Sequence, residues 1–160
     1  MTIIGTIGAN GCNYQVMEFT GEGAKTLSIS ERMVLCNMAV EAGAKTGIFE
    51  PDEKAIEYLK AHGRKPKALF TSDPDAVYAR EYTFDLSKIR PVVAKPDFVD
   101  NLVPAEEVRG VKIDEAFLGS CNNGRIEDLR VGASIIKGKK SLKKFVSLWF
   151  RQARLSISRH

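Results

Sequence analysis

The chain has 160 residues, 44% of them hydrophobic and 28% charged, which is typical of an ordinary globular domain and excludes a disordered or fibrous chain. No apolar run approaches the roughly 20 residues that a membrane-spanning helix needs, and the N-terminus lacks the basic and apolar segments of a signal peptide. We therefore expect a cytoplasmic protein without a membrane partner.

The formal net charge of +4 would ordinarily suggest a nucleic-acid partner. Its distribution argues against one, because residues 141–160 hold five lysines and arginines and no acid. Removing those five from the total of 24 leaves 19 basic residues against 20 acidic ones. The basic character belongs to this tail alone, and no nucleic-acid partner is expected.

Residues 3–11 combine β-branched side chains with glycines that permit tight turns, and residues 14–19 alternate in the manner of a strand. A serine, Ser28 or Ser30, then precedes a helical run over 33–42 that ends at Gly43. Apolar residues surround much of this run, which predicts a helix buried against a sheet.

Residues 47–49 are predicted to form a short strand, and residues 51–53 begin a second helix that reaches about residue 62. Residues 63–75 are basic and then rich in turn formers, so an exposed loop is expected. The tyrosine, threonine and phenylalanine content of residues 78–85 favours a strand. Residues 90–95 form a further apolar strand, and residues 101–108 are a proline-interrupted connection and the candidate domain boundary.

The last predicted unit is a strand over 116–120, a tight loop over 121–125 and a helix over 126–136 with Glu127 and Asp128 in its first turn. In α/β units the loop that leaves such a strand is the usual place for ligands. Cys121 lies on this loop beside a helix N-terminus, which favours the thiolate form. The other cysteines, Cys12 and Cys36, are widely spaced from it, and an odd number of cysteines does not indicate a disulfide framework.

Two groups of motifs resemble one known family. The first comprises EFTGE at 18–22, RM at 32–33, CNMAVEAGA at 36–44 and PDE at 51–53. These segments are similar to the second domain of the large subunits of 3-isopropylmalate dehydratase and homoaconitase, in the aconitase superfamily. GSCNNGRIEDLR at 119–130 resembles the cluster-binding loop of the same proteins.

The resemblance implies a 4Fe–4S cluster that three thiolates hold, with one iron left open as a Lewis acid for hydroxyl and carboxylate groups of the substrate. By its match, Cys121 is the first cluster ligand, and Glu18 is an acidic residue that approaches the iron-bound oxygen. Asn123 and Arg125 are expected to shape the cluster loop. The alternatives are a surface glutamate at position 18 and a plain turn with a solvated arginine at 125. Cys36 has the plainer interpretation of a helix-core residue.

The chain departs from the family at several places. Asn122 stands where threonine is usual, and Asp97 stands where histidine is usual. The other two cluster cysteines belong to a downstream Cys-x-x-Cys motif that this sequence does not contain, and the family's histidine- and aspartate-bearing first domain is not found either.

Residues 141–160 do not resemble the family. When the third base of each codon is taken with the first two of the next, permitted codon choices allow SEEVRFIVVPASKTVYLEA, which looks like the family's continuation. We therefore hypothesise a frameshift near codon 140. The alternative is a basic amphipathic helix with Leu142, Phe145, Leu148 and Trp149 on one face, able to dock on a partner.

The expected fold is α/β: a nearly complete layered α/β/α domain of aconitase type over 1–108, the start of a second over 109–140, and a non-family tail over 141–160. A truncated second domain would leave the strand at 116–118 with an unpaired edge. The resemblance implies a hydro-lyase of leucine biosynthesis, with a small subunit as partner and a branched hydroxy di- or tricarboxylate as substrate. The alternatives are homoaconitase of lysine biosynthesis and a non-catalytic remnant or interaction module, since one thiolate cannot hold a cubane cluster.

Overall fold

The computed structural model describes residues 1–139 and the backbone of residues 146–149. The chain divides into two compact units, Met1–Arg109 and Gly110–His160. This division falls beside the domain boundary suggested by the sequence, and the assignment of the two units as aconitase-type domains stays a prediction. The mixed helices and strands confirm the expected α/β class.

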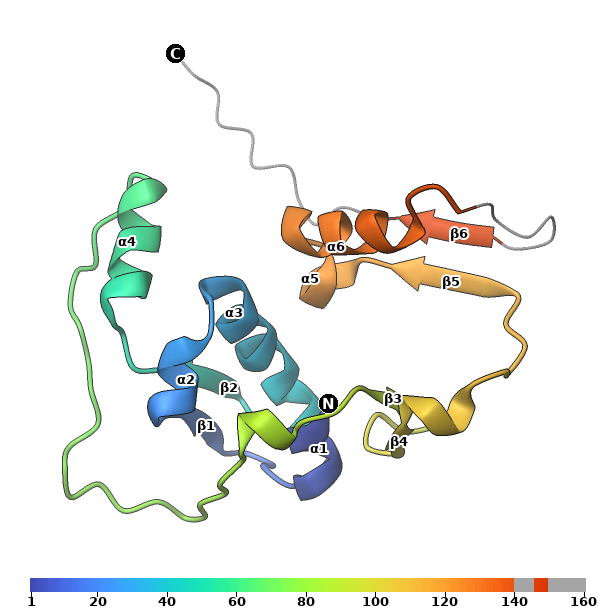
Figure 1. The fold of residues 1–160 in the computed structure, drawn as a ribbon. Helices are drawn as coiled ribbons and strands as arrows, with labels where there is room; N and C mark the ends of the chain where they lie inside the picture. Colours follow the sequence, from blue (N-terminus) through green and yellow to red (C-terminus); the bar gives the residue numbers. More distant parts are fainter. Residues whose placement is uncertain (140–145, 150–160) are drawn as a thin grey trace. The chain divides into compact units, whose positions relative to one another are not determined.

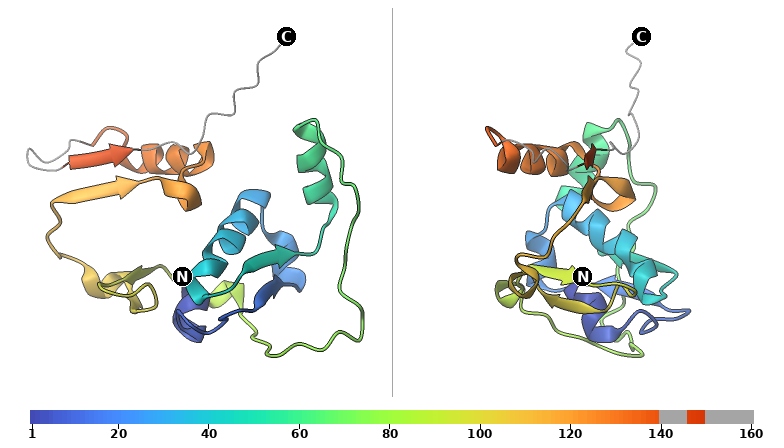
Figure 2. Two further views of the ribbon diagram at one scale, coloured as in Figure 1. Left: turned by 180° about the vertical axis from the view of Figure 1, so that it is seen from behind. Right: turned by 90° about the vertical axis from the view of Figure 1, so that its right-hand side faces the viewer.

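The first part of unit 1 places helices around a parallel pair of strands (Figure 1). β1 and β2 run parallel, with Glu18 opposite Ile48. Figure 2 shows from two further directions that α3 lies along β2, which it contacts more extensively than any other element. The elements are α1 (Thr2–Ile7), β1 (Val16–Phe19), α2 (Glu22–Thr26), α3 (Ile29–Met38), the 3-10 helix η1 (Ala39–Ala42), β2 (Thr46–Phe49) and α4 (Glu53–Ala61).

The boundaries of α3 follow from two local signals. Ser28 is the N-cap: its Oγ accepts a hydrogen bond from the Glu31 N–H at 3.3 Å, and Glu31 Oε2 accepts one from the Ser28 N–H at 2.7 Å. This reciprocal pair satisfies backbone donors that the first turn of a helix leaves free. The pKa of Glu31 is lowered because its carboxylate accepts that backbone bond. Gly43 ends η1 at φ +79°, so the predicted helix and its end are confirmed.

The hydrophobic core of unit 1 consists of small side chains. Among the described residues, the buried apolar ones are Ile4, Ala39, Ala42 and Ala44. A Cβ at the buried residue Gly47 would lie 2.9 Å from the Cα of Cys36, so β2 can approach α3 closely because this position is glycine. Small residues thus bring the helix and the strand together.

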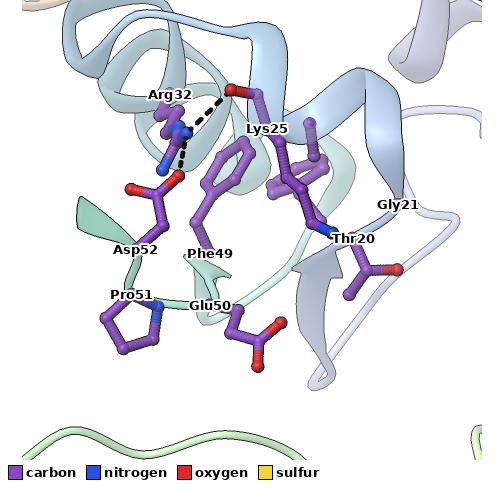
Figure 3. Close-up of a pocket in the computed structure, with 10 residues that line it drawn as sticks. Thr20, Gly21, Lys25, Arg32, Phe49, Glu50, Pro51 and Asp52 are labelled. Carbon is purple, nitrogen blue, oxygen red and sulfur yellow. Dashed lines mark hydrogen bonds and ion pairs between the residues drawn. The ribbon is translucent and has the colours of Figure 1, made fainter. Parts of the chain in front are cut away.

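Arg32 is the buried charged residue at the centre of these elements, with 5% of its surface exposed. Its Nη2 pairs with Asp52 Oδ2 at 2.5 Å, and its Nε donates to the Leu27 carbonyl at 3.2 Å. The guanidinium lies 5.6 Å from the centre of the Phe49 ring, so the cation also contacts an aromatic face. Figure 3 shows Arg32 and Asp52 pointing toward one another, with Phe49 beside them and a further hydrogen bond to the carbonyl of Lys25.

Asp52 has a second role, as the N-cap of α4. Its Oδ1 accepts from the Ala55 N–H at 3.1 Å while Oδ2 holds Arg32. One carboxylate therefore fixes the start of α4 relative to α3. The helix that the sequence predicted to begin at residues 51–53 is confirmed.

The rest of unit 1 differs in part from the prediction. Residues 63–85 form an exposed loop, and the strand expected over 78–85 is wrong: no described strand pairs with this segment, and almost all its side chains are exposed. A lone strand leaves its backbone groups without the ladder that would stabilise it. The loop leads to a short 3-10 helix, η2 (Leu86–Lys88).

The chain then forms an antiparallel pair. β3 (Val92–Ala94) pairs with β4 (Leu102–Pro104), which is followed by a 3-10 helix, η3 (Ala105–Val108). The strand predicted over 90–95 is confirmed, whereas the connection expected over 101–108 contains this second strand.

Unit 2 contains β5 (Glu115–Leu118), one helical turn α5 (Ser120–Asn123), α6 (Ile126–Ile136) and β6 (Val146–Trp149). The helix over 126–136 is confirmed residue by residue, while part of the predicted tight loop is the turn α5. β6 pairs in parallel with β5, so one edge of β5, which was expected to lack a partner, has a neighbouring strand. An amphipathic helix through residues 146–149 is wrong because these residues are a strand; the remaining tail hypotheses lie outside the described residues.

In the part of the chain that the structure describes, no helix combines the length and the apolar character that crossing a bilayer demands.

The Arg32–Asp52 pair predicts a specific loss of stability. Replacing Asp52 by alanine leaves a buried guanidinium without its carboxylate and removes the cap of α4. The free energy of unfolding is expected to fall by about 2–3 kcal/mol in urea denaturation. Glu53→Ala is the matched control, because Glu53 is exposed on the same turn. Equal losses in the two variants would contradict the proposed importance of the pair.

The same pair predicts an acid dependence. The Arg32 side chain donates to Asp52 and holds the pKa of that carboxyl below its ordinary value. This stabilisation is complete above the ordinary aspartate pKa of about 3.9 and is lost as the pH falls through the lowered native value. Asp52→Asn, which does not titrate there, should show a smaller decrease in urea midpoint than the parent chain from about pH 5 to about pH 2. Parallel decreases would contradict the assignment.

Candidate functional site

Cys121 lies just after β5 on a backbone of unusual conformation. Gly119 has φ +151° and Ser120 has φ +76°, a region that non-glycine residues rarely adopt. This reversal places the Cys121 side chain on the exposed surface of α5, where Ser120 Oγ donates to its sulfur at 3.7 Å. Such strained positions cluster at functional sites, which supports a role for this turn.

The segment that follows Cys121 is fixed by Asp128, in the first turn of α6. Asp128 Oδ2 accepts from the Arg125 N–H at 3.0 Å, and its Oδ1 accepts from Asn123 Nδ2 at 3.1 Å. The Arg125 guanidinium donates to the Asn122 carbonyl at 2.6 Å. Asn123 and Arg125 thus hold the Cys121 turn in one shape, while the guanidinium is half-buried rather than fully solvated.

The amide of Asn122 is incompletely satisfied. Its Oδ1 is buried and has no hydrogen-bond partner within the described part of the chain. A buried acceptor without a donor costs on the order of 1–3 kcal/mol. This is the position at which the resemblance described above implies threonine.

The Cys121 turn does not form a complete metal site by itself. Among residues 1–139, no group of three histidine, cysteine or carboxylate side chains is placed to hold a metal ion. A cubane cluster takes three or four thiolates. The described residues therefore fit one corner of such a cluster and not the whole of it.

Glu18 lies in unit 1, next to the last residue of β1. Its Oε1 and Oε2 each lie 2.8 Å from Ser72 Oγ, and the Tyr78 hydroxyl donates to Oε2 at 2.8 Å. Residue Glu18 is half-buried, and two hydroxyl groups from the loop over 63–85 bind its carboxylate at an exposed position. The carboxyl ends of parallel strands commonly carry functional groups.

The structure brings Cys121, Asn123 and Arg125 together on one turn of unit 2 and places Glu18 in unit 1. Sequence reasoning overlooked Ser72 and Tyr78, and it placed Asp128 in the first turn of a helix without its contacts to Asn123 and Arg125. The Arg-x-x-Asp spacing at the start of α6 could have indicated the bond to Arg125, because an acid three residues after an N-cap often accepts its N–H. Ser72 and Tyr78 lie 54 and 60 residues from Glu18, and no local pattern reports such pairs.

The remaining cysteines differ from Cys121 in their surroundings. Cys36 is half-buried in α3, and burial raises the pKa of its thiol. Cys12 lies in the turns between α1 and β1, where its N–H donates to the Ala42 carbonyl. Cys36 is therefore a partly buried helix residue, and its interpretation as a helix-core residue stays a prediction.

Comparison with known proteins gives one family. The model of the aconitase family (aconitate hydratase) matches residues 1–109. The large subunit of 3-isopropylmalate dehydratase from Caldicellulosiruptor saccharolyticus is 53% identical over 139 residues, which are 86% of this chain and 32% of that protein.

Two further relatives give similar values. The 3-isopropylmalate dehydratase large subunit of a Sulfurihydrogenibium species is 49% identical over 140 residues, 88% of this chain and 32% of its own. A Methanosarcina mazei protein named "Probable methanogen homoaconitase large subunit" is 49% identical over 138 residues, 86% of this chain and 35% of its own. The chain thus spans about a third of the length of the curated relatives it matches.

The environments of the cysteines predict their order of alkylation. At about pH 7, iodoacetamide should modify Cys121 at least about tenfold faster than Cys36, because Cys121 is exposed while burial of Cys36 disfavours its reactive thiolate. Peptide mass spectrometry over time measures both rates. In denaturant the two rates should converge, and equal rates in the native chain would contradict the assigned burial.

Proposed function

The chain belongs to the aconitase family, and from that membership we propose that it forms part of the large subunit of 3-isopropylmalate dehydratase, a hydro-lyase of leucine biosynthesis. The observation that carries the proposal is the 53% identity over 86% of the chain to a protein of that name. Most of the similar proteins reported above have the same name, which favours this activity over the homoaconitase reaction.

Cys121 is the proposed cluster ligand. Family membership implies an iron–sulfur cluster, which Cys121 would help to hold and which would supply Lewis-acid chemistry toward a substrate hydroxyl. Two observations support this role: Cys121 is exposed, and Asp128 accepts hydrogen bonds from Asn123 and Arg125. The hydrogen bonds matter because a ligand-bearing loop must hold its thiol in a fixed position. The other thiolates would come from sequence that the relatives have and the described residues do not supply.

Glu18 is the proposed acid–base residue. Its carboxylate stands at the carboxyl end of β1 and keeps acceptor positions open beyond those that Ser72 and Tyr78 occupy. A carboxylate held in this manner can accept or return a proton at a substrate oxygen or carbon. This role follows from the match of EFTGE at 18–22 to the family and from the geometry of the bound carboxylate.

The remaining parts of the proposal come from the family. The relatives are named large subunits, so a small subunit is the expected partner, and a small branched hydroxy di- or tricarboxylate is the expected substrate. A cytoplasmic location without a nucleic-acid or membrane partner completes it.

A second candidate is a non-catalytic remnant or interaction module. It is favoured by the single cysteine on the candidate loop and by the lack of any complete ligand set among residues 1–139. The two candidates differ in whether the chain supports cluster binding and hydration when the rest of a large subunit is provided.

A chimera separates these candidates. The 139 matched residues of the Caldicellulosiruptor saccharolyticus large subunit are replaced by the matching part of this chain, and the product is combined with that organism's small subunit. After anaerobic cluster reconstitution, the proposal predicts iron–sulfur charge-transfer absorbance and hydration of isopropylmaleate. Cys121→Ser should abolish both signals, because a hydroxyl does not replace a thiolate in such clusters.

Cys36→Ser is the matched control and should retain the cluster, since Cys36 lies in α3. A chimera that pairs with the small subunit but holds no cluster supports the remnant view. Hydration of the homoaconitase substrate in preference to isopropylmaleate would support the other family member. Retention of the cluster in Cys121→Ser would overturn the ligand assignment.

A further inference from the structure

We propose that Ser72 and Tyr78 are positioning residues that hold the Glu18 carboxylate in a single orientation and fasten the loop over 63–85 across it. The positioning role deepens, and rests on, the proposed function of Glu18. The fastening of the loop is a property of the chain that needs no substrate.

The hydrogen bonds define how the carboxylate is held. A serine hydroxyl has one hydrogen, so the two 2.8 Å contacts of Ser72 Oγ with Oε1 and Oε2 are one shared hydrogen bond. The Tyr78 hydroxyl supplies a second hydrogen to Oε2 at 2.8 Å. Ser72 contacts both carboxylate oxygens and Tyr78 contacts Oε2, so the two donors together restrict the rotation of the carboxylate more than either does alone.

The loop has little else to hold it. Residues 64–85 contain no helix or strand, and Phe70 and Val77 are 81% and 96% exposed. Apolar burial therefore contributes little to its position. Besides the bonds to Glu18, a bond from Arg80 to the Gly11 carbonyl at 3.2 Å ties this loop to the preceding part of unit 1. Loops of this length without their own structure are commonly functional.

The carboxylate also lies at a hollow between the loop and the strand ends. Residues 70–72 line one side, and Glu18 with residues 48–50 lines the other. Loss of the two hydroxyls would free both the carboxylate and this wall of the hollow. The loop thus keeps Glu18 oriented, and Glu18 in return keeps the loop in place.

Trypsin cleavage after Lys67, an exposed residue of the loop, measures the fastening in the chain itself. Ser72→Ala and Tyr78→Phe are each expected to speed cleavage about three- to tenfold, the effect of losing one hydrogen bond of ordinary net strength at an exposed site. Ser72→Thr, which restores a hydroxyl, should cleave at the parent rate, and so should the control Thr71→Ala. In a Glu18→Ala background, Ser72→Ala and Tyr78→Phe should have no further effect.

The orientation of Glu18 is read by the ¹³C signal of its carboxyl carbon, assigned with Glu18→Gln. Ser72→Ala and Tyr78→Phe should shift this signal and Ser72→Thr should restore it, which a merely structural effect on the loop would not do. Equal acceleration of cleavage with and without Glu18, or an unchanged carboxyl signal, would overturn the proposal. Because neither measurement uses substrate, a failed hydration assay of the chimera leaves this result intact, and the two failures are distinguishable.

Discussion

The buried guanidinium of Arg32 is the interaction on which the first part of unit 1 depends. A core made of Ile4 and three alanines buries little apolar surface, so it cannot by itself fix the directions in which helices leave the strands. Arg32 supplies that constraint, because a buried cation must keep its partners, which include the Leu27 carbonyl, the Asp52 carboxylate and the face of Phe49. These partners come from the segment before α3, the start of α4 and the end of β2.

The position of Glu18 follows from this constraint. Phe19 and Phe49, the last residues of β1 and β2, stack with ring centres 5.0 Å apart, and Phe49 is also the ring beneath Arg32. The stacking of Phe19 on Phe49 orders the ends of both strands and thereby sets the position of the Glu18 carboxylate, one residue before Phe19. Parallel strands end at one edge of a sheet, so the chain presents its candidate acid at the edge where α/β folds bind ligands.

The parts of this fold that could be predicted from sequence are those with local causes. The Ser28 cap, the left-handed Gly43 and the acids at the start of α6 each act within four residues. The end of the first helical segment and both ends of α6 were predicted correctly, whereas α3 begins four residues before the predicted run over 33–42. The strand predicted over 78–85 was wrong because residues of high β-propensity form a strand only when a neighbouring strand pairs with them. In this segment Tyr78 instead donates a hydrogen bond to Glu18. Cys121 and Glu18 were found through motifs, whereas the side chains that hold Glu18 come from a distant loop and leave no local signal.

Both candidate sites are ordered by polar contacts rather than by the core. Asp128 binds the backbone before α6 and the Asn123 amide, while Glu18 is bound by two hydroxyls. Hydrogen bonds of this kind have small net effects on stability but fix direction, since each fails when its angle is wrong. A reactive group that is already oriented before a substrate arrives needs less rearrangement in the reaction. The hydrogen bonds that orient side chains therefore lie beside Cys121 and Glu18, where orientation affects chemistry. Both residues lie among mostly exposed residues, so burial could not supply that orientation.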